Sequence, residues 1–353
     1  MNAIPLVPSP EPIPAPWPVF EILGVLLFML HILCINVVLG GSLLALLSKG
    51  PKENSVAEAI LKKIPSALAL GVTLGIAPLL FLQVLYGHLI YTSSILMALW
   101  WILIIPLLII AYYGTYLHAH TPVRWLGRVS IGLAALIFLY IVFIYTNNMT
   151  LMLQPEKWSG YFTQRGGTLL NWSDASLWPR YLHFVVASVA VAGLFTGLVW
   201  QIRLKKGVPG AAEEVRKGLR LFAIATTLQV AVGLWFLVTL PREIMRAFMG
   251  GHLLYTILLG LGIILAIGAL VLAFKGKFWP AFAHLIALTL VMVLNRMAVR
   301  DLYIGRFFRV SDLPLKPQYD VMILFVLILF AGLGAVWYMV RVAMAAGERR
   351  EGL

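Results

Sequence analysis

The chain has 353 residues, of which 61% are hydrophobic and 12% are charged, and its mean hydropathy is +0.93. Soluble domains contain about 45 to 50% apolar residues, so this composition excludes a soluble globular protein and indicates a membrane protein with several spans. The formal net charge is +13, but the basic residues stand in short runs between apolar stretches. That pattern orients helices in a bilayer, and we therefore expect no nucleic acid partner.

Residues 1–17 are rich in proline and contain no Lys or Arg. A cleavable signal peptide needs a basic start, and a folded domain needs an apolar core, so this segment predicts neither. We expect an extended arm that lies across a neighbouring surface.

Nine stretches are apolar over about 20 residues or more, which is the length of a helix that crosses a bilayer. The predicted fold is therefore an all-α polytopic helical bundle. Pro78 and Pro106 lie inside the second and third stretches and should kink them. The predicted spans run approximately from Val19 to Leu47, Ser66 to Tyr91, Ile95 to Leu117, Val129 to Thr146, Arg180 to Ile202, Leu219 to Leu240, His252 to Phe274, Phe278 to Met297 and Val321 to Val342.

Most of the 27 Lys and Arg residues fall on one side of the membrane if the N-terminus lies outside. Basic loops stay inside, so we expect a bacterial inner-membrane protein with an outer N-terminus and a cytoplasmic C-terminus. Four arginines gather instead on the outer side after the eighth span. Haem propionates, quinone carbonyls or another subunit would be partners for them, and a solvated loop is the plain alternative. They are Arg296, Arg300, Arg306 and Arg309.

The stretch from Ser176 to Leu194 places His183 just inside an otherwise apolar helix. Trp178 and Arg180 suit the membrane interface one turn earlier. A titratable side chain at that depth is costly and is a candidate for function, and imidazole is a common axial ligand of haem iron. The plain alternative is a histidine that hydrogen-bonds a neighbouring helix. No Cys-x-x-Cys-His motif occurs, so any haem would be held by coordination and packing alone.

Four further histidines lie within or near the spans: His31 near the middle of the first, His88 and His252 near the outer surface, and His284 nearer the inner side. The segments around His31 and His183 read alike, because each has a small polar residue five positions later and Gly ten later. This repeat predicts two four-helix halves and a ninth helix, with cofactors held between facing helices. The expected organisation is an arm (1–17), a first half (18–147), an outer loop (148–178), a second half (179–299), and an Arg-rich loop, helix and tail (300–353).

The mid-helix His31, the N-N-M-T-L-M-L-Q-P run of Asn147–Pro155, the L-W-P-R-Y-L-H stretch and nine helices with an outer N-terminus together resemble subunit I of the cytochrome bd quinol oxidases. The resemblance covers nearly the whole chain in topology, although its motifs are sparse. It implies that an asparagine-rich turn follows the fourth helix, that His183 ligates a low-spin haem b, and that His31 ligates a second haem.

The sequence departs from that family where oxygen is reduced. The second span has Gln83 where the family has a glutamate, the third span has no acid, and the eighth lacks the family's glutamate. We therefore expect no buried carboxylate in the membrane interior, which argues against oxygen reduction. The family's long quinol loop is reduced to Leu240–Gly251, and Leu258 stands where the family has a methionine ligand. His252, with Met249 next, is the substitute in this sequence.

These residues favour a haem b-binding membrane subunit of an oxidoreductase complex of the quinol:cytochrome c type. It would carry electrons between a membrane quinol and a c-type cytochrome or other redox subunit on the outer face. His183 and His252 would ligate one haem, and His31 with His88 or His284 a second. Three arginines are placed to meet haem propionates: Arg180, Arg242 and Arg246.

Three alternatives remain open from the sequence. A divergent bd-type terminal oxidase would need a proton-delivering residue in its core. A haem-free, quinone-binding membrane anchor resembling the polysulfide-reductase type would use the histidines as hydrogen-bond donors to quinone. A transporter would need a polar site at mid-membrane between its repeats, and the core charges usual in ion-coupled carriers are lacking.

Overall fold

The computed structural model describes residues 6–47 and 60–351, with side chains as far as residue 345. Within these ranges it is an all-α bundle, and nine helical segments are long and apolar enough to cross a membrane. The predicted number of spans is thereby confirmed. The crossing elements are α1 (Trp17–Leu47), α3 (Ile64–Leu96), α4 and α5 (Ala98–Ile102 and Ile104–His120, one span), α6 (Arg124–Leu153), α7 (Leu177–Lys205), α8 (Ala211–Thr239), α10 (Leu253–Phe274), α11 (Phe278–Ile304) and α12 (Tyr319–Glu351).

Short elements join the long helices at one end of the bundle. We call this the outer end, after the orientation that the basic residues predict. The short elements are η1 (Pro155–Phe162), α9 (Arg242–Arg246), a π-helical turn η2 (Ala247–Gly251) and η3 (Val310–Asp312).

The third span is broken as its proline predicts. Leu103 separates α4 from α5 just ahead of Pro106, whose nitrogen has no hydrogen to donate to the preceding turn. The second span differs. Its recorded departure from helical geometry lies at Tyr86 (φ −130°, ψ 25°) and not beside Pro78.

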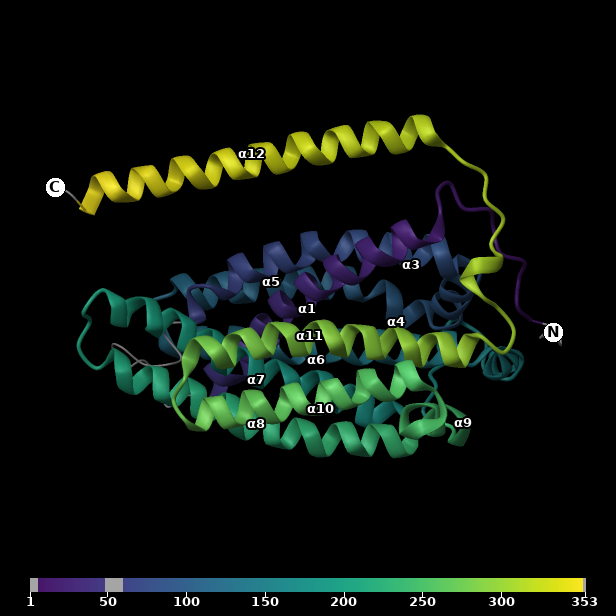
Figure 1. Ribbon diagram of the computed structural model, residues 1–353, viewed down its shortest axis with the longest axis horizontal. Helices are drawn as coiled ribbons and strands as arrows, with labels where there is room; N and C mark the ends of the chain where they lie inside the picture. Colours follow the sequence, from purple (N-terminus) through teal and green to yellow (C-terminus); the bar gives the residue numbers. More distant parts are fainter. Residues whose placement is uncertain (1–5, 48–59, 352–353) are drawn as a thin grey trace.

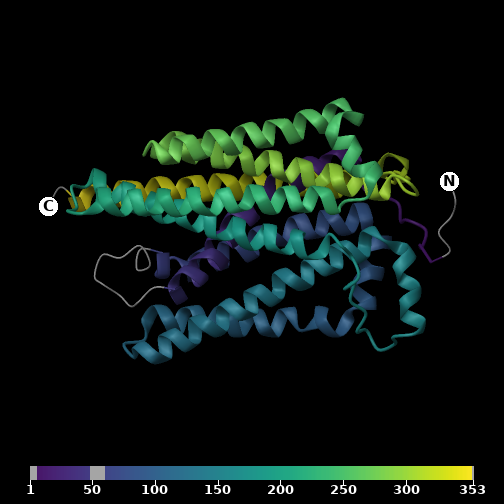
Figure 2. The same ribbon diagram turned by 90° about the horizontal axis from the view of Figure 1, so that it is seen from below.

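The two halves of the chain show the same pattern of neighbours. α1 pairs with α3 as α7 pairs with α8, and α5 pairs with α6 as α10 pairs with α11. The contacts between the two halves follow the same pattern, because the last helix of each half packs against the first helix of the other: α6 against α7, and α11 against α1. Figure 2 shows α5 and α6 on one flank and α10 on the opposite flank. This packing agrees with the repeat read from the sequence.

The halves meet where α1 crosses α7. A Cβ atom placed on Gly40 would lie 2.0 Å from the carbonyl oxygen of Ser188 and 2.8 Å from the Cβ of Ala192. No side chain larger than hydrogen fits there, so the two backbones touch directly. Small residues permit this kind of close helix approach in membranes.

The proline-rich arm lies against the loop that leads into α12. The amide of Ile13 donates to the carbonyl of Pro314 at 2.8 Å, and the amides of Lys316 and Gln318 donate to Ile13 and Pro14, each at 2.9 Å. Ile13 is only 2% exposed. The described part of the arm, residues 6–17, thus lies along the segment between α11 and α12.

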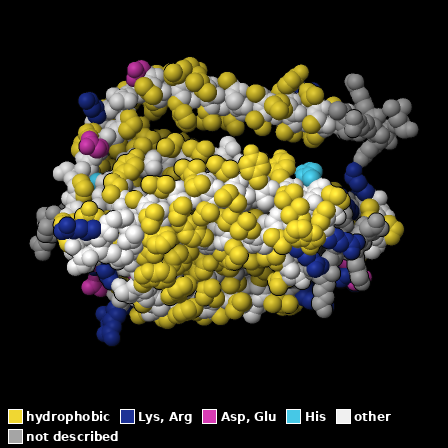
Figure 3. Space-filling view, turned by 180° about the vertical axis from the view of Figure 1, so that it is seen from behind, with side chains coloured by type: hydrophobic (Ala, Val, Ile, Leu, Met, Phe, Trp, Pro, Cys, Tyr) yellow, Lys and Arg dark blue, Asp and Glu magenta, His cyan; other side chains and the backbone are white. Residues whose placement is uncertain are grey.

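Helix α12 stands clear of the other helices over most of its length (Figures 1 and 3). No residue of its apolar window is buried. The remaining bundle carries a wide hydrophobic band, with Lys and Arg gathered towards its ends (Figure 3). This distribution suits a protein surrounded by lipid.

Two predicted boundaries are wrong. The asparagine-rich run was expected to form a turn after the fourth helix, but α6 continues to Leu153 and contains most of it. The eighth span was expected to end at Met297, but α11 continues to Ile304, so Arg296 and Arg300 lie within the helix and not in a loop. In both cases polar side chains find partners inside the bundle, which allows the helix to run on.

Truncating Ile13 to alanine should release the segment that carries α12. Loss of a buried isoleucine side chain costs about 2 to 5 kcal/mol, and the cost should fall on the arm and its hydrogen bonds. Amide hydrogen exchange at Ile13, Lys316 and Gln318 should therefore accelerate in Ile13→Ala. The exposed Leu6 provides the control. Equal acceleration in Leu6→Ala would contradict the idea that buried Ile13 holds the arm against the segment before α12.

Candidate functional site

His183 lies in the second turn of α7 and faces α8. A Cβ atom on Gly233 would come within 3.2 Å of its Cε1 atom. The Nδ1 atom is buried and has no hydrogen-bond partner among the described residues. A buried unpaired polar atom costs about 1 to 3 kcal/mol, so the structure does not support the plain interpretation of a histidine that hydrogen-bonds a neighbouring helix through Nδ1.

Arg180 precedes His183 by about one turn of α7. Its guanidinium carbon lies 4.8 Å from the ring centroid of Phe236, while its Nε and Nη2 atoms are buried without a partner among the described residues. It interacts electrostatically with Asp174 and Tyr303. Arg180 therefore brings a cation with free donors next to the buried imidazole.

A second cation from α11 faces the same region. The guanidinium of Arg296 lies over the ring of Phe28 at 4.6 Å, and its Nη2 atom donates to the sulfur of Met149 at 3.4 Å. Its charge and that of Arg180 repel each other. No ion pair of either residue with a carboxylate is recorded in the described chain. Two like charges that form no close ion pair with a carboxylate among the described residues are the pattern expected of a site for an anionic group.

His31 is oriented by a different helix. Its Nδ1 atom is 2.7 Å from the carbonyl oxygen of Gly71 on α3, and a Cβ atom on Gly75 would lie 2.6 Å from the ring. Since Nδ1 donates to that carbonyl, Nε2 is left as the free nitrogen. Metal-ligating histidines usually have this arrangement.

The other predicted histidines lie apart from this site. His88 packs edge-on against Phe308 at 4.5 Å, and its Nε2 atom is buried without a partner in the described chain. His284 makes a hydrogen bond of 2.9 Å to Pro280 in its own helix. His252 is exposed at the start of α10 and stacks on Tyr255 at 4.3 Å.

The short loop before α10 is also at the surface. Met249 is 65% exposed, and Arg242 and Arg246 are exposed. No contact between His252 and His183 is recorded among the described residues. The structure therefore brings Arg180 and Arg296 towards the region of His183, but leaves His252, Met249 and Arg246 outside it.

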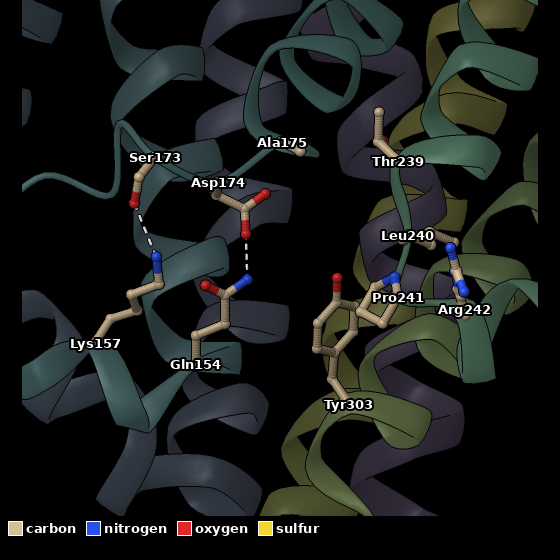
Figure 4. Close-up of a pocket in the computed structure, with 10 residues that line it drawn as sticks. All are labelled: Gln154, Lys157, Ser173, Asp174, Ala175, Thr239, Leu240, Pro241, Arg242 and Tyr303. Carbon is tan, nitrogen blue, oxygen red and sulfur yellow. Dashed lines mark hydrogen bonds between the residues drawn. The ribbon is translucent and has the colours of Figure 1, made fainter.

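A polar pocket of about 350 Å³ opens at the outer end (Figure 4). On one side Gln154 hydrogen-bonds Asp174, and Lys157 donates to Ser173 at 2.8 Å. On the opposite side stand the hydroxyl of Tyr303 and the turn between α8 and α9. The remaining lining residues are Ala175, Thr239, Leu240, Pro241 and Arg242.

The asparagine-rich run at the end of α6 holds together the elements that form this pocket. The Oδ1 atom of Asn147 accepts the amide of Asn171 at 3.1 Å, and Asn148 bonds to Ser93 and Ser94 on α3. Both asparagines are fully buried. They tie the end of α6 to α3 and to the segment before α7, which gives the run a structural role.

Carboxylates pair with arginine at the outer end of the membrane-crossing helices, where Glu21 on α1 lies 3.5 Å from Arg300 on α11. Glu21 is half-buried in the first turns of its helix and Asp301 is exposed, so neither is a buried carboxylate of the membrane interior. Asp301 accepts hydrogen bonds from the same arginine at 3.2 Å and from Tyr86 at 3.3 Å. Arg300 also lies over the Tyr86 ring at 4.2 Å. This group therefore satisfies Arg300, whereas Arg296 stays without a carboxylate.

Comparison with protein-family models found no match to this chain, and comparison with the sequences of curated proteins found none either.

Sequence reasoning missed one further residue near His183. Gln229 lies one turn before Gly233 on the same face of α8, and its Oε1 atom is buried without a partner in the described chain. A lone amide inside an apolar span was the available signal, because such groups are costly in a bilayer.

Substituting Gly75 with alanine should displace the His31 ring. The added Cβ would lie 2.6 Å from Nδ1 and Cε1, so the hydrogen bond to Gly71 must break or the helices must separate. Overpacking of this kind costs about 1 to 3 kcal/mol, to be measured as the free energy of unfolding in mixed micelles. Gly260 on α10 has open space around it, so Gly260→Ala is the control. A similar loss in both variants would argue against the contact.

The Glu21–Arg300 pair should show energetic coupling in a double-mutant cycle. We expect a coupling of about 0.5 to 3 kcal/mol between Glu21→Gln and Arg300→Gln, because residues that share one network couple by that amount. The matched control is the exposed pair of Lys217 and Glu213 on α8, where solvent screens the charges and a much smaller coupling is expected. Unfolding free energies of the single and double variants measure both couplings. Equal values would refute the stabilising role at the outer end.

Proposed function

We propose that this chain is a haem b-binding membrane subunit of a respiratory complex that transfers electrons between a membrane quinol and a redox partner on the outer face. The observation that carries the proposal is the group of unpaired polar atoms near the outer end. The buried Nδ1 of His183 lies one turn below the buried donors of Arg180. An imidazole and a guanidinium left unpaired in this way have the chemistry that would hold iron and a propionate.

The residues present fit a haem at this position in part. His183 offers a ring nitrogen as an axial ligand, and Arg180 and Arg296 offer donors for two carboxylates. When bound, the haem would supply a one-electron carrier. The opposite axial ligand stays a prediction, since His252 and Met249 lie at the surface and would have to move inwards to reach the iron. Arg246, proposed to meet a propionate, is exposed as well.

His31 supports the proposal of a second haem. Its Nδ1 bond to Gly71 fixes the ring, and its Nε2 atom is the nitrogen available to iron. His284, one of its two proposed counterparts, is held by a bond within its own helix. His88 has a buried Nε2 atom without a partner in the described chain, and it is the better of the two on this ground.

The outer pocket is the proposed site for the quinol head group. Asp174 and Tyr303 would meet the quinol hydroxyls, and Asp174 is the carboxylate of the lining that could take a proton to the outer surface. Arg180 interacts with both of these residues. The pocket is thus linked electrostatically to the cation beside His183.

We further propose that other subunits complete the complex, among them a c-type cytochrome on the outer face. The unpacked α12 supports a partner within the membrane, because no residue of its apolar window is buried against this chain. The resemblance to subunit I of the cytochrome bd oxidases and the location in a bacterial inner membrane are part of the same proposal.

Two alternatives keep support from particular observations. The outer pocket would equally serve a haem-free quinone-binding anchor. A divergent terminal oxidase would have the carboxylates of Glu21 and Asp301 available near the outer end, outside the membrane interior. Quinol-dependent oxygen consumption by the purified complex would identify the oxidase.

Replacing His183 with alanine should abolish one haem per chain while the protein remains in the membrane. A reduced-minus-oxidised spectrum with haem b quantified per chain is the measurement. His118→Ala is the control, since His118 bonds to Gly127 at 2.6 Å near the inner end. Unchanged haem in His183→Ala would reject the assignment, and colourless wild-type protein would favour the quinone-binding anchor.

A further inference from the structure

A second pocket, of about 480 Å³, lies at the other end of the bundle, which we call the inner end. It is formed where α7 ends, α8 begins and the turn between α10 and α11 closes. Its volume falls in the range of about 300 to 1,000 Å³ that is usual for small-molecule sites. It is lined by Gln201, Leu204, Ala212, Val215, Arg216, Gly276, Lys277, Phe278, Trp279 and Pro280.

One wall of this pocket is apolar and firmly held. Phe278 is 4% exposed, and a Cβ atom on Gly197 of α7 would lie 3.0 Å from its ring. Trp279 and Leu204 stay partly open, with exposures of 46% and 37%. An indole at the end of a membrane-crossing helix lies at the level of the lipid head groups.

The polar side of the pocket is positively charged. Arg216 and Lys277 line it, and the Nζ of Lys205 lies 5.3 Å from the Trp279 ring. None of the described lining residues is a carboxylate. The nearby acids of α8 do not line the pocket: Lys217 pairs with Glu213 at 3.0 Å and with Glu214 at 2.7 Å. Glu213 also attracts Arg216 electrostatically and offsets part of its charge.

We propose that this pocket binds the phosphate head group of an anionic phospholipid. Arg216 and Lys277 contact the phosphate, Gln201 donates to a head-group oxygen, and an acyl chain leaves along Leu204 and Trp279. Basic pockets between membrane helices have this chemistry. A free phosphate would satisfy the cations equally well, but it would leave the apolar wall uncovered. The proposal does not depend on haem.

The test is native mass spectrometry of the delipidated full chain, titrated with phosphatidylglycerol or phosphatidylcholine of the same acyl chains. Each basic residue at an anionic lipid contributes about a fivefold gain in affinity. The double variant Arg216→Gln/Lys277→Gln should therefore lose about 25-fold in affinity for phosphatidylglycerol and little for phosphatidylcholine.

The matched control removes two charges from the same elements without touching the pocket. Arg220→Gln/Lys275→Gln should keep the wild-type preference, because neither residue lines the pocket. The charge-conserving Arg216→Lys/Lys277→Arg should retain most of the binding, which separates a lost site from a misfolded chain. The proposal fails if wild type binds both lipids equally, if the control loses as much as the pocket variant, or if inorganic phosphate displaces the lipid at equal concentration.

Discussion

The close contact of α1 with α7 is the constraint on which the rest of the structure depends. A glycine at position 40 lets the α1 backbone rest on Ser188 of α7. Because α3 and α11 pack on α1, and α8 and α6 pack on α7, this crossing sets the distance between the halves. It also fixes how far apart the two candidate ligands, His31 and His183, can lie. A larger residue at Gly40 would separate both at once.

The polar groups of the outer half differ in how well they are paired. Arg300 has a carboxylate on each side and an aromatic ring beneath it. Arg296 and Arg180 have rings and a thioether, but no carboxylate bond within the described chain. Removing a guanidinium from water costs several kcal/mol unless interactions with a partner offset the lost hydration. Arg300 is thus paired within this chain, whereas Arg180 and Arg296 form no ion pair with a carboxylate among the described residues, and our proposal of a bound anionic group rests on that difference.

The sequence was sufficient for the parts of the fold that depend on hydropathy and period. It predicted an all-α bundle of nine spans, because burial in lipid leaves few alternatives to a continuous helix. It failed where polar residues are satisfied by distant partners. The residues around Asn147 and Glu21 in the sequence do not predict that their partners are Asn171 and Arg300. For the same reason it proposed His183 and Arg180, whose signal is local, and passed over Gln229, whose neighbour across the helices is distant in the sequence.

The pairing of His183 with His252 shows the limit of arguing from depth alone. Both residues lie at the outer ends of their helices, but depth does not specify the face of a helix. His183 points at Gly233 of α8, whereas His252 stacks on Tyr255 in the first turn of α10. The segment η2, directly before His252, is a π-helical turn with Gly250 at φ +108°. Glycine adopts that conformation at little cost, so this segment is where the chain could rearrange if a ligand at His183 requires a second nitrogen.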